Sequence, residues 1–369
     1  NMEAAVVWDS LYTWYTQSDS GYTTIYARFG DADPNQALVE INVRPACFYP
    51  DRNFISYITV QGFEMSQAAT QWAAPTAEQP GLIGVNWSKG WIIENNLIHD
   101  SKCSGITLGK DRFTGDNMWS KDRSIDGSLH YNEAVHRVIA YGWNKDSIGS
   151  HIVRNNIIYN CGEAGICGSF GGAYSQITGN HIYNIYTYRV YRGAEMGAIK
   201  LHAAIDAVIS DNYVHHANIG LWLDWMAQGV RVSGNLFHDN NEMDFFIEVS
   251  HGPYLVDNNF FLSSASIRDM SQGGAFVNNL IGGAVSFTPQ KRKTPFFSPH
   301  TTRWLGIQPI TGGDNRYYNN IFTGSPQTAK ASEVAHWPKW VKWRYGLAVY
   351  DSSLFKVTAD GNLYTNGKF

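Results

Sequence analysis

A short pattern built around asparagine recurs along the chain and constrains its fold more than any other feature. In each copy an asparagine is followed by two or three residues that include apolar side chains, as in Arg154-Asn155-Asn156-Ile157-Ile158. The marker asparagines of the copies are Asn96, Asn156, Asn180, Asn212, Asn235, Asn259, Asn279 and Asn320. Between positions 156 and 279 successive markers are 20 to 32 residues apart, about the length of one solenoid coil.

Asparagine suits a turn between two strands, because it tolerates the left-handed backbone conformation and its amide can hydrogen-bond to a neighbour. In stacked coils each marker would lie above the previous one, so a ladder of amides could form. The flanking apolar residues alternate as in strands with one buried face, and long helical periodicity is absent. The pattern predicts an all-β, right-handed parallel β-helix. A β-sandwich with asparagine turns is the alternative.

Two long segments, residues 110–150 and 289–316, interrupt the repeat. Long loops that leave one face of a solenoid commonly build its binding site, so we expect both near the functional site. The β-helix itself is expected over residues 51–325. Residues 1–50 and 326–369 lack the repeat and are expected to form caps or parts of an accompanying β-sandwich.

The composition argues against several classes of partner. Net charge is −4 without a basic block, which disfavours nucleic acid. No apolar run approaches the roughly 18 residues of a membrane span. Aromatic residues make up 14% and charged residues only 16% of the chain; this balance suits sugar-binding proteins and large all-β cores alike. The sequence as given shows no signal peptide, and a cytoplasmic and a secreted mature form both stay open.

The cysteines and the other possible ligands give no sign of a metal site. The four cysteines, Cys47, Cys103, Cys161 and Cys167, lack zinc-binding spacing. We interpret them as buried or free thiols, with a disulfide left open. No metal constellation is visible elsewhere, so we expect that the chemistry needs neither a metal nor another cofactor.

Three of the predicted strands carry titratable residues in matching places. They are Ala198-Ile199-Lys200-Leu201-His202, Leu221-Trp222-Leu223-Asp224 and Phe245-Phe246-Ile247-Glu248. Side chains alternate along a strand, so the apolar set Leu201, Leu223 and Ile247 is predicted to point inward. One outward column is then His202, Asp224 and Glu248, and a second is Lys200, Trp222 and Phe246.

The spacing of the two acids predicts a reaction type. Adjacent coils lie roughly 4.8 Å apart, so the carboxyl groups of Asp224 and Glu248 are expected about 5 Å apart. Retaining glycosidases use carboxyl groups at about 5–5.5 Å, one as nucleophile and one as acid/base. Solvated surface carboxylates are the plainer interpretation. The neighbouring Trp222 and Trp225 favour catalysis, since a carboxylate among aromatic rings is costly unless it has a task.

Other residues near this column are candidates for binding the substrate. They are Glu195, Lys200, His202, Trp222, Trp225 and His251. Lys200 and His202 could hold sugar hydroxyls or the nucleophile, and Glu195 could bind hydroxyls or cap a turn. The two tryptophans could be sugar platforms or packing residues. We expect Glu163 and Asp244 to be structural.

Residues 193–262 carry a resemblance to a known family. The motifs Gly193-Ala194-Glu195-Met196, Leu221-Trp222-Leu223-Asp224-Trp225 and Glu248-Val249-Ser250-His251-Gly252-Pro253 resemble glycoside hydrolase family 120. The likeness extends over about residues 55–325. It implies a retaining β-xylosidase built as a β-helix with a β-sandwich, which releases xylose from xylobiose or short xylo-oligosaccharides.

The resemblance also implies roles for individual residues. Asp224 corresponds to the nucleophile, Glu248 to the acid/base and Glu195 to a further glutamate of the pocket. The chain is shorter than full-length members at both ends. The position of the acid/base depends on the alignment across Asn240-Asn241-Glu242, where Glu242 is the alternative.

Three other functions stay open from the sequence. A polysaccharide lyase on the same fold would use Lys200 as its base. A non-catalytic carbohydrate-binding β-helix would bind sugar without turnover, and an inverting hydrolase would use another pair of carboxylates. The sequence does not determine the sugar or the oligomeric state.

Overall fold

The protein divides into two compact units, residues 1–43 and residues 44–369. The computed structural model describes residues 13–116, 118–122, 124–189, 191, 195–326 and 341–365. The described part of the first unit contains an antiparallel hairpin of β1 (Trp14–Ser18) and β2 (Thr23–Ala27).

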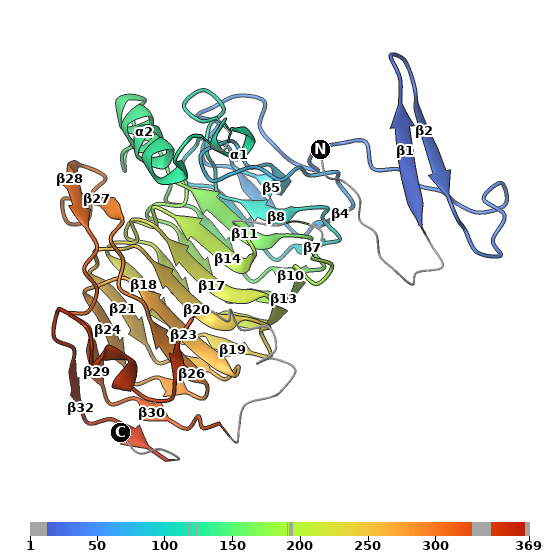
Figure 1. Cartoon of the computed structure of the whole chain (residues 1–369). Helices are drawn as coiled ribbons and strands as arrows, with labels where there is room; N and C mark the ends of the chain where they lie inside the picture. The colour runs from blue at the N-terminus through green and yellow to red at the C-terminus, as the bar shows by residue number, and fades with distance from the viewer. Residues whose placement is uncertain are drawn as a thin grey trace. The chain divides into compact units, whose positions relative to one another are not determined.

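The second unit is a solenoid of three sheets whose neighbouring strands are parallel, with one antiparallel strand, β31, at an end of sheet I (Figure 1). Sheet I contains β5 (Gly81–Gly84), β8 (Ser104–Thr107), β11 (Ala164–Ser169), β14 (Gly197–His202), β17 (Ile219–Asp224), β20 (Met243–Glu248), β23 (Ala265–Met270), β26 (Ala284–Phe287) and β31 (Trp343–Arg344). Sheet II contains β3 (Thr59–Gln61), β6 (Ile92–Glu94), β9 (Ile152–Arg154), β12 (Gln176–Thr178), β15 (Val208–Ser210), β18 (Val230–Ser233), β21 (Tyr254–Asp257), β24 (Gly274–Val277), β29 (Arg316–Tyr318) and β32 (Thr358–Asp360). Sheet III contains β4 (Glu64–Ser66), β7 (Leu97–His99), β10 (Ile157–Tyr159), β13 (His181–Ile185), β16 (Tyr213–Ala217), β19 (Leu236–His238), β22 (Phe260–Phe261), β25 (Leu280–Ile281), β30 (Ile321–Phe322) and β33 (Leu363–Tyr364).

Each complete coil visits the sheets in the order II, III and I, and the next coil repeats the path one strand further along. Because each strand pairs with its counterpart in the next coil, the backbone hydrogen bonds run between coils. The predicted parallel β-helix is confirmed.

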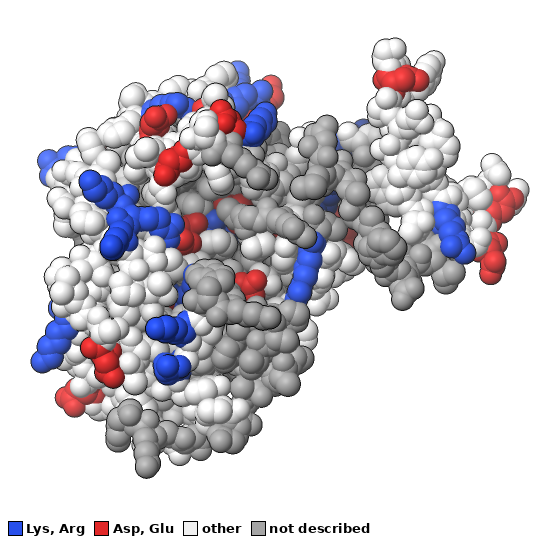
Figure 2. All heavy atoms as spheres, in the orientation of Figure 1, with Lys and Arg blue, Asp and Glu red and all other residues white. Residues whose placement is uncertain are grey.

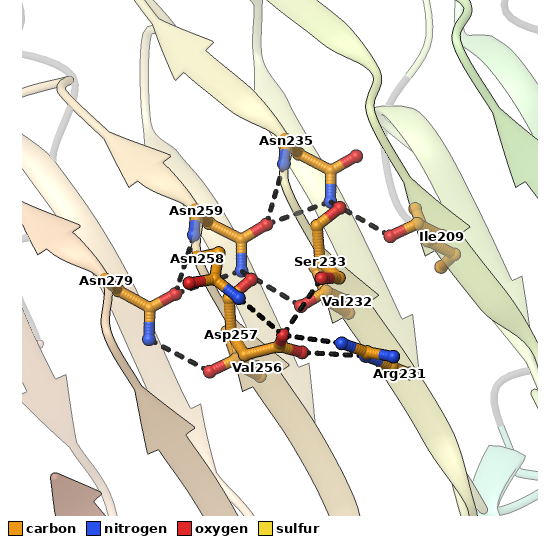
Figure 3. A network of polar contacts seen from close by, with 10 residues as sticks. All are labelled: Ile209, Arg231, Val232, Ser233, Asn235, Val256, Asp257, Asn258, Asn259 and Asn279. Carbon is orange, nitrogen blue, oxygen red and sulfur yellow. Dashed lines mark hydrogen bonds and ion pairs between the residues drawn. The ribbon is translucent and has the colours of Figure 1, made fainter.

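The marker asparagines form the predicted ladder between sheets II and III. Asn235 shows the pattern: its Nδ2 donates to Oδ1 of Asn259 over 2.9 Å and to the carbonyl oxygen of Ile209 over 2.9 Å (Figure 3). Its own Oδ1 accepts from the backbone N and from Nδ2 of Asn212. Hydrogen bonds from Nδ2 of one asparagine to Oδ1 of the next link all eight markers in this way. The ladder also reaches Asn362, which is not among the markers predicted from the sequence.

The left-handed backbone at this turn lies one residue before each marker. Asn155 precedes Asn156 with φ +55°, and Gly179 precedes Asn180 with φ +65°. Two neighbouring residues therefore meet the two requirements of this turn, a left-handed backbone and a side-chain amide for the ladder. The first residue takes the left-handed conformation, which Asn, Asp and Gly tolerate, and the marker supplies the amide.

The inside of the solenoid is apolar, as the strand alternation predicts. Leu201, Leu223 and Ile247 are fully buried in one column of sheet I. A parallel column of sheet I, also fully buried, contains Ile83, Ile106, Ile166, Ile199, Leu221, Phe245, Ile267 and Val285. Burial of each such side chain contributes about 1.5–3 kcal/mol to folding.

Residues 110–150, which the sequence analysis treated as a loop, contain two helices. They are α1 (Met118–Lys121) and α2 (Gly127–Ala140). Asp126 caps α2 by accepting from the backbone N–H groups of Ser128 and Leu129. The buried face of α2 contains His130, Tyr131, Ala134, Val135 and Val138. The second interruption, residues 289–316, forms a hairpin of β27 (Lys293–Phe297) and β28 (Trp304–Pro309).

The C-terminal segment, residues 326–369, contributes strands to the solenoid where it is described. β32 pairs with β29 in sheet II, and β33 pairs with β30 in sheet III. A short 3-10 helix, Ala348–Tyr350, packs beside β26 and β31 of sheet I. All four cysteines are free thiols, and three of them are buried. Within the described ranges, no helix has the length and apolar character needed to cross a membrane.

Candidate active site

Asp224 and Glu248 end two neighbouring strands of sheet I and are register partners. His202 on β14 pairs with Asp224 on β17, which pairs with Glu248 on β20. This is the outward column that the sequence predicts. Neighbouring strands are about 4.8 Å apart, so the two acids lie one rung apart on the same face.

A cleft of about 510 Å³ lies over this column, within the size range of small-ligand sites. Sheet I contributes His202, Trp222, Asp224, Trp225 and Glu248 to its lining. The segment with the two helices contributes Trp119, Asp126, Gly127, Ser128 and Tyr131; Arg292 comes from the second interruption, and Pro75 and Thr76 complete the lining. Both interruptions of the repeat therefore reach the cleft, as expected from the sequence.

The two oxygens of Asp224 have different surroundings. Oδ2 lies 3.1 Å from Nζ of Lys200 and 3.1 Å from Nε2 of His202. Oδ1 is buried and has no hydrogen-bond partner among the described residues. Within the described part of the chain, the carboxylate is thus held through one oxygen, and the lone pairs of the other oxygen are not used.

Glu195 and Lys200 lie behind Asp224 and do not line the cleft. Lys200 Nζ lies 2.9 Å from Oε1 of Glu195, so its ammonium group bridges the two acids. Burial would raise the pKa of Glu195, but Lys200 and His202 bring it below its ordinary value. Burial opposes the charge of Lys200, yet Glu195 and Asp224 raise its pKa. Both groups are therefore ionised at neutral pH.

Glu248 has a different balance of charges. Its pKa is raised to about 7, first by burial and then by the negative charge of Asp224, while Arg292 opposes the rise. Nη2 of Arg292 lies 2.5 Å from Oε1 of Glu248. Nε1 of Trp222 donates to Oε2 over 3.2 Å. Such a group exchanges a proton near neutral pH, as an acid/base must.

Aromatic rings surround the two acids. The ammonium of Lys200 lies 4.1 Å from the ring centroid of Trp222, whose other neighbour in the stack is Phe246. Trp225 meets Tyr131 edge-on, with ring centroids 5.6 Å apart. These rings lie beside the carboxylates and give the cleft apolar surfaces, which suit the faces of a sugar ring.

Two predicted site residues require comment. His251 does not line this cleft; its Nε2 donates to the carbonyl oxygen of Thr294 over 3.0 Å, in strand β27. The chain turns directly after Glu248, which moves His251 under the hairpin. Glu242 immediately precedes β20 and is also absent from the cleft lining.

The two acids expected to be structural differ from each other. Asp244 accepts from Nδ2 of Asn240 and from the backbone N of Ser263, which is a structural task. Glu163 is fully buried, and its pKa is raised to about 8, mainly by burial and then by Glu195. Glu163 is therefore a neutral acid near the ion pairs at neutral pH.

Sequence reasoning missed Arg292 and Tyr131. Arg292 lies in the basic run Lys291-Arg292-Lys293, a visible signal in a chain with so few charges. Tyr131 belongs to the buried face of α2, and its OH lies 3.0 Å from Oγ of Ser169. Its ring packs on His202 at 4.9 Å.

On the face drawn in Figure 2, basic and acidic side chains are interspersed among many uncharged ones. This distribution fits a neutral ligand better than a polyanion. Among the described residues, no group of three or more His, Cys, Asp and Glu side chains could hold a metal ion.

Comparisons with known proteins agree with this architecture. A family model described as a right handed beta helix region matches residues 132–281, and one described as the glycoside hydrolase 120 insertion domain matches residues 2–41. A solved structure of XylC in complex with xylose superposes with a TM-score of 0.88 at 49% sequence identity. The match covers 97% of this chain and 58% of that chain, so the chain spans a little over half of that relative's length. A comparison with curated protein sequences gives no match.

Proposed function

We propose that this chain is a member of glycoside hydrolase family 120 and a β-xylosidase that hydrolyses short xylo-oligosaccharides with retention of configuration. One observation carries the proposal: the register pairing of Asp224 with Glu248 on adjacent strands beneath a single cleft. One rung of a parallel sheet is about 4.8 Å, which matches the separation of carboxyl groups in retaining enzymes and is too short for the intervening water of inverting ones.

In the first half-reaction Oδ1 of Asp224 attacks the anomeric carbon of the sugar. The bond from that carbon to the leaving oxygen breaks, and Glu248 transfers its proton to this oxygen. The assignment of Oδ1 is supported by the lack of a donor to it among the residues that the structure describes, whereas Oδ2 is held by Lys200 and His202. Because Oδ2 is held, the carboxylate has a fixed orientation, and Oδ1 keeps its lone pairs for the attack.

In the second half-reaction Glu248 removes a proton from water, whose oxygen attacks the anomeric carbon and releases Asp224. Because the pKa of Glu248 is raised to about 7, part of its carboxyl group is protonated near neutral pH and can give the proton in the first step. Asp224 is an uncharged ester in the intermediate, so its repulsion of the Glu248 carboxylate disappears. Glu248 then becomes the stronger acid and remains ionised as a base.

The sugar assignment is supported by the relative whose structure contains xylose. The sheet side of the cleft offers Trp222 and Trp225, and the segment with the two helices offers Trp119 and Tyr131. Rings on both sides suit a pyranose, and the modest volume suits a short oligosaccharide better than a polymer.

A lyase mechanism has less support. It would need Lys200 as a base that reaches the sugar, but Lys200 is fully buried and pairs with Glu195 and Asp224. Those ion pairs raise its pKa, so the amine keeps its proton. A general base needs the reverse.

Proton NMR during hydrolysis of an aryl β-xyloside tests the proposal. We expect β-xylose to appear before mutarotation, because two displacements at one carbon restore its configuration. α-Xylose as the first product would contradict the pairing of nucleophile and acid/base. Binding of xylobiose without turnover would favour the carbohydrate-binding alternative, and ultraviolet-absorbing unsaturated products from an acidic polysaccharide would favour the lyase.

A slow substrate locates the nucleophile. A 2-deoxy-2-fluoro-β-xyloside with a dinitrophenolate leaving group should trap the glycosyl-enzyme, because the fluorine slows both steps and the leaving group rescues the first. We expect peptide mass mapping to find the sugar on Asp224. A label on Glu248 or Glu195 would reassign the roles.

A further inference from the structure

We propose that Arg292 is a positioning residue that holds Glu248 in its ionised form and so prepares it to act as the base of the second half-reaction. The inference rests on the proposed function, because Arg292 has this task only if Glu248 is the acid/base. The guanidinium Nη2 lies 2.5 Å from Oε1 of Glu248 at the edge of the cleft. A charge-assisted bond of this kind favours the carboxylate over the carboxylic acid.

Arg292 is brought to the site by a hairpin that is fixed to the solenoid. It directly precedes β27. Gln228 clamps that strand: its Nε2 donates to the carbonyl oxygen of Phe297 over 2.8 Å, and its Oε1 accepts from the Phe297 backbone N over 3.1 Å. His251 donates to the carbonyl oxygen of Thr294 in the same strand. These contacts give the arginine a defined approach to Glu248.

Each carboxylate oxygen of Glu248 has its own donor. Trp222 on β17 donates to Oε2, and Arg292, which precedes the hairpin strand β27, donates to Oε1. The Arg292 guanidinium also lies 5.6 Å from the ring centroid of Trp225. The side chain is partly exposed and lines the cleft. It can therefore move aside for a leaving sugar while the buried Trp222 contact remains.

The other charged groups around Glu248 have partners of their own. They are Asp224 on β17, Lys200 and His202 on β14, Arg268 on β23, and Asp126 before α2. Lys200 is bound by Glu195 and Asp224. The guanidinium of Arg268 stacks on Phe246, with its carbon 4.4 Å from the ring centroid. Arg292 forms an ion pair with Glu248 itself.

The effect of Arg292 differs between the two half-reactions. Before the attack, the charge of Asp224 opposes Arg292, and Glu248 can keep the proton that it gives to the leaving oxygen. In the ester intermediate the charge of Asp224 is gone while that of Arg292 remains. The carboxylate is then favoured, and it can accept a proton from the attacking water.

The substitution Arg292→Gln tests the inference, with Arg303→Gln as the matched control. Arg303 lies in the same hairpin but is exposed, and its Nη2 donates to Oγ of Ser298. For Arg292→Gln we expect the alkaline limb of kcat/KM to move up by about one pH unit, since an opposite charge at hydrogen-bond distance shifts a carboxyl pKa by about 1–3 units. At pH 6 we expect slower deglycosylation, by at most about tenfold for a shift of one pH unit, seen as a larger burst before a lower steady rate with an activated aryl xyloside.

Arg292→Lys should return the limb toward that of the wild type, because the charge is kept. If Arg292→Gln lowers kcat/KM equally at every pH with an unmoved limb, the arginine only supports the hairpin and the inference is overturned. Thermal unfolding of both glutamine variants shows whether either one disturbs the fold.

A measurement without substrate separates this inference from the proposed function. Carbon-13 NMR titration of the carboxyl of Glu248, assigned with Glu248→Gln, should give a higher pKa in Arg292→Gln than in the wild type. An unchanged pKa would overturn the inference even if the enzyme turns over xylosides. If the wild type releases α-xylose first, the proposed function fails, and the role of Arg292 toward a base fails with it, whatever that pKa is.

Discussion

The ammonium nitrogen of Lys200 lies 3.1 Å from Oδ2 of Asp224, although the two residues come from different coils and different outward columns of sheet I. The lysine reaches its target by crossing from one column to the other. Its second carboxylate partner, Glu195, lies five residues earlier in the chain. One buried cation thus ties the proposed nucleophile to a residue outside the cleft.

Lys200→Met should therefore damage both activity and stability. Methionine keeps the volume but leaves the buried carboxylates of Glu195 and Asp224 without their cation. Breaking a buried ion pair costs about 3–5 kcal/mol of unfolding free energy, which urea unfolding would detect. We expect kcat/KM to fall at least about 100-fold.

The double variant Lys200→Met/Glu195→Gln provides the control. It removes one of the two stranded charges, so it should recover part of the stability but not the activity. A Lys200→Met enzyme with wild-type stability would contradict the ion-pair account.

Trp222→Phe isolates the hydrogen bond to Glu248. Phenylalanine keeps an aromatic ring between Lys200 and Phe246 but has no N–H group for Oε2 of Glu248. That donor favours the carboxylate, so its loss should raise the pKa of Glu248 above its value of about 7. We expect the alkaline limb of kcat/KM to move to higher pH, by less than in Arg292→Gln because the donor is uncharged. An alkaline limb that moves to lower pH would refute this direction.

The parts of the site that were predictable from sequence are those set by local periodicity. Alternation within a strand placed Asp224 and Glu248 in one outward column, and the coil repeat placed their strands side by side. The same repeat located the asparagine ladder. Neither inference needed knowledge of how distant segments meet, because each strand pairs with its neighbour one coil away.

The rest of the cleft depends on contacts between the two interruptions, which no period encodes. Oγ1 of Thr302, in the hairpin, donates to the carbonyl oxygen of Trp143 over 2.7 Å, and His136 of α2 meets Trp304 edge-on. Those contacts join segments about 160 residues apart. The sequence consequently shows Arg292 as a charged residue of a loop, but it does not predict that Arg292 contacts Glu248.

The asparagine ladder should be more sensitive in its middle than at its end. Asn235→Ala would remove the bonds to Ile209 and Asn259 and would leave the backbone N and side-chain amide of Asn212 without their acceptor. Each buried polar group left unpaired costs about 1–3 kcal/mol. We expect a loss of about 3 kcal/mol or more in unfolding free energy, measured with urea.

Asn362 is the matched comparison, because it accepts from Asn320 on one side and among the described residues has no further marker beyond it. Asn362→Ala should therefore cost less than Asn235→Ala. Equal losses would mean that the ladder does not act through its buried amide pairs.

A stack of rings on the outside of sheet III predicts how stability depends on pH. His215 lies between Tyr183, at a centroid distance of 5.2 Å, and His238, at 5.0 Å, with its ring nearly parallel to both. Burial, followed by the neighbouring His216, His238 and His181, lowers the pKa of His215 to about 4. The folded protein therefore favours the neutral ring more strongly than the unfolded chain does.

The sign of the effect follows from that difference. The unfolded chain binds a proton at His215 near pH 6.5, whereas the folded protein does so only near pH 4. The stability linked to the neutral ring is complete above the unfolded pKa and is lost as the pH falls toward the folded one. His215→Phe keeps a ring in the stack but does not titrate. Between pH 7 and pH 4 the wild type should thus lose more unfolding free energy than His215→Phe, as measured by urea unfolding at each pH. If the two proteins lose equal amounts, the ring stack does not couple folding to protonation of His215.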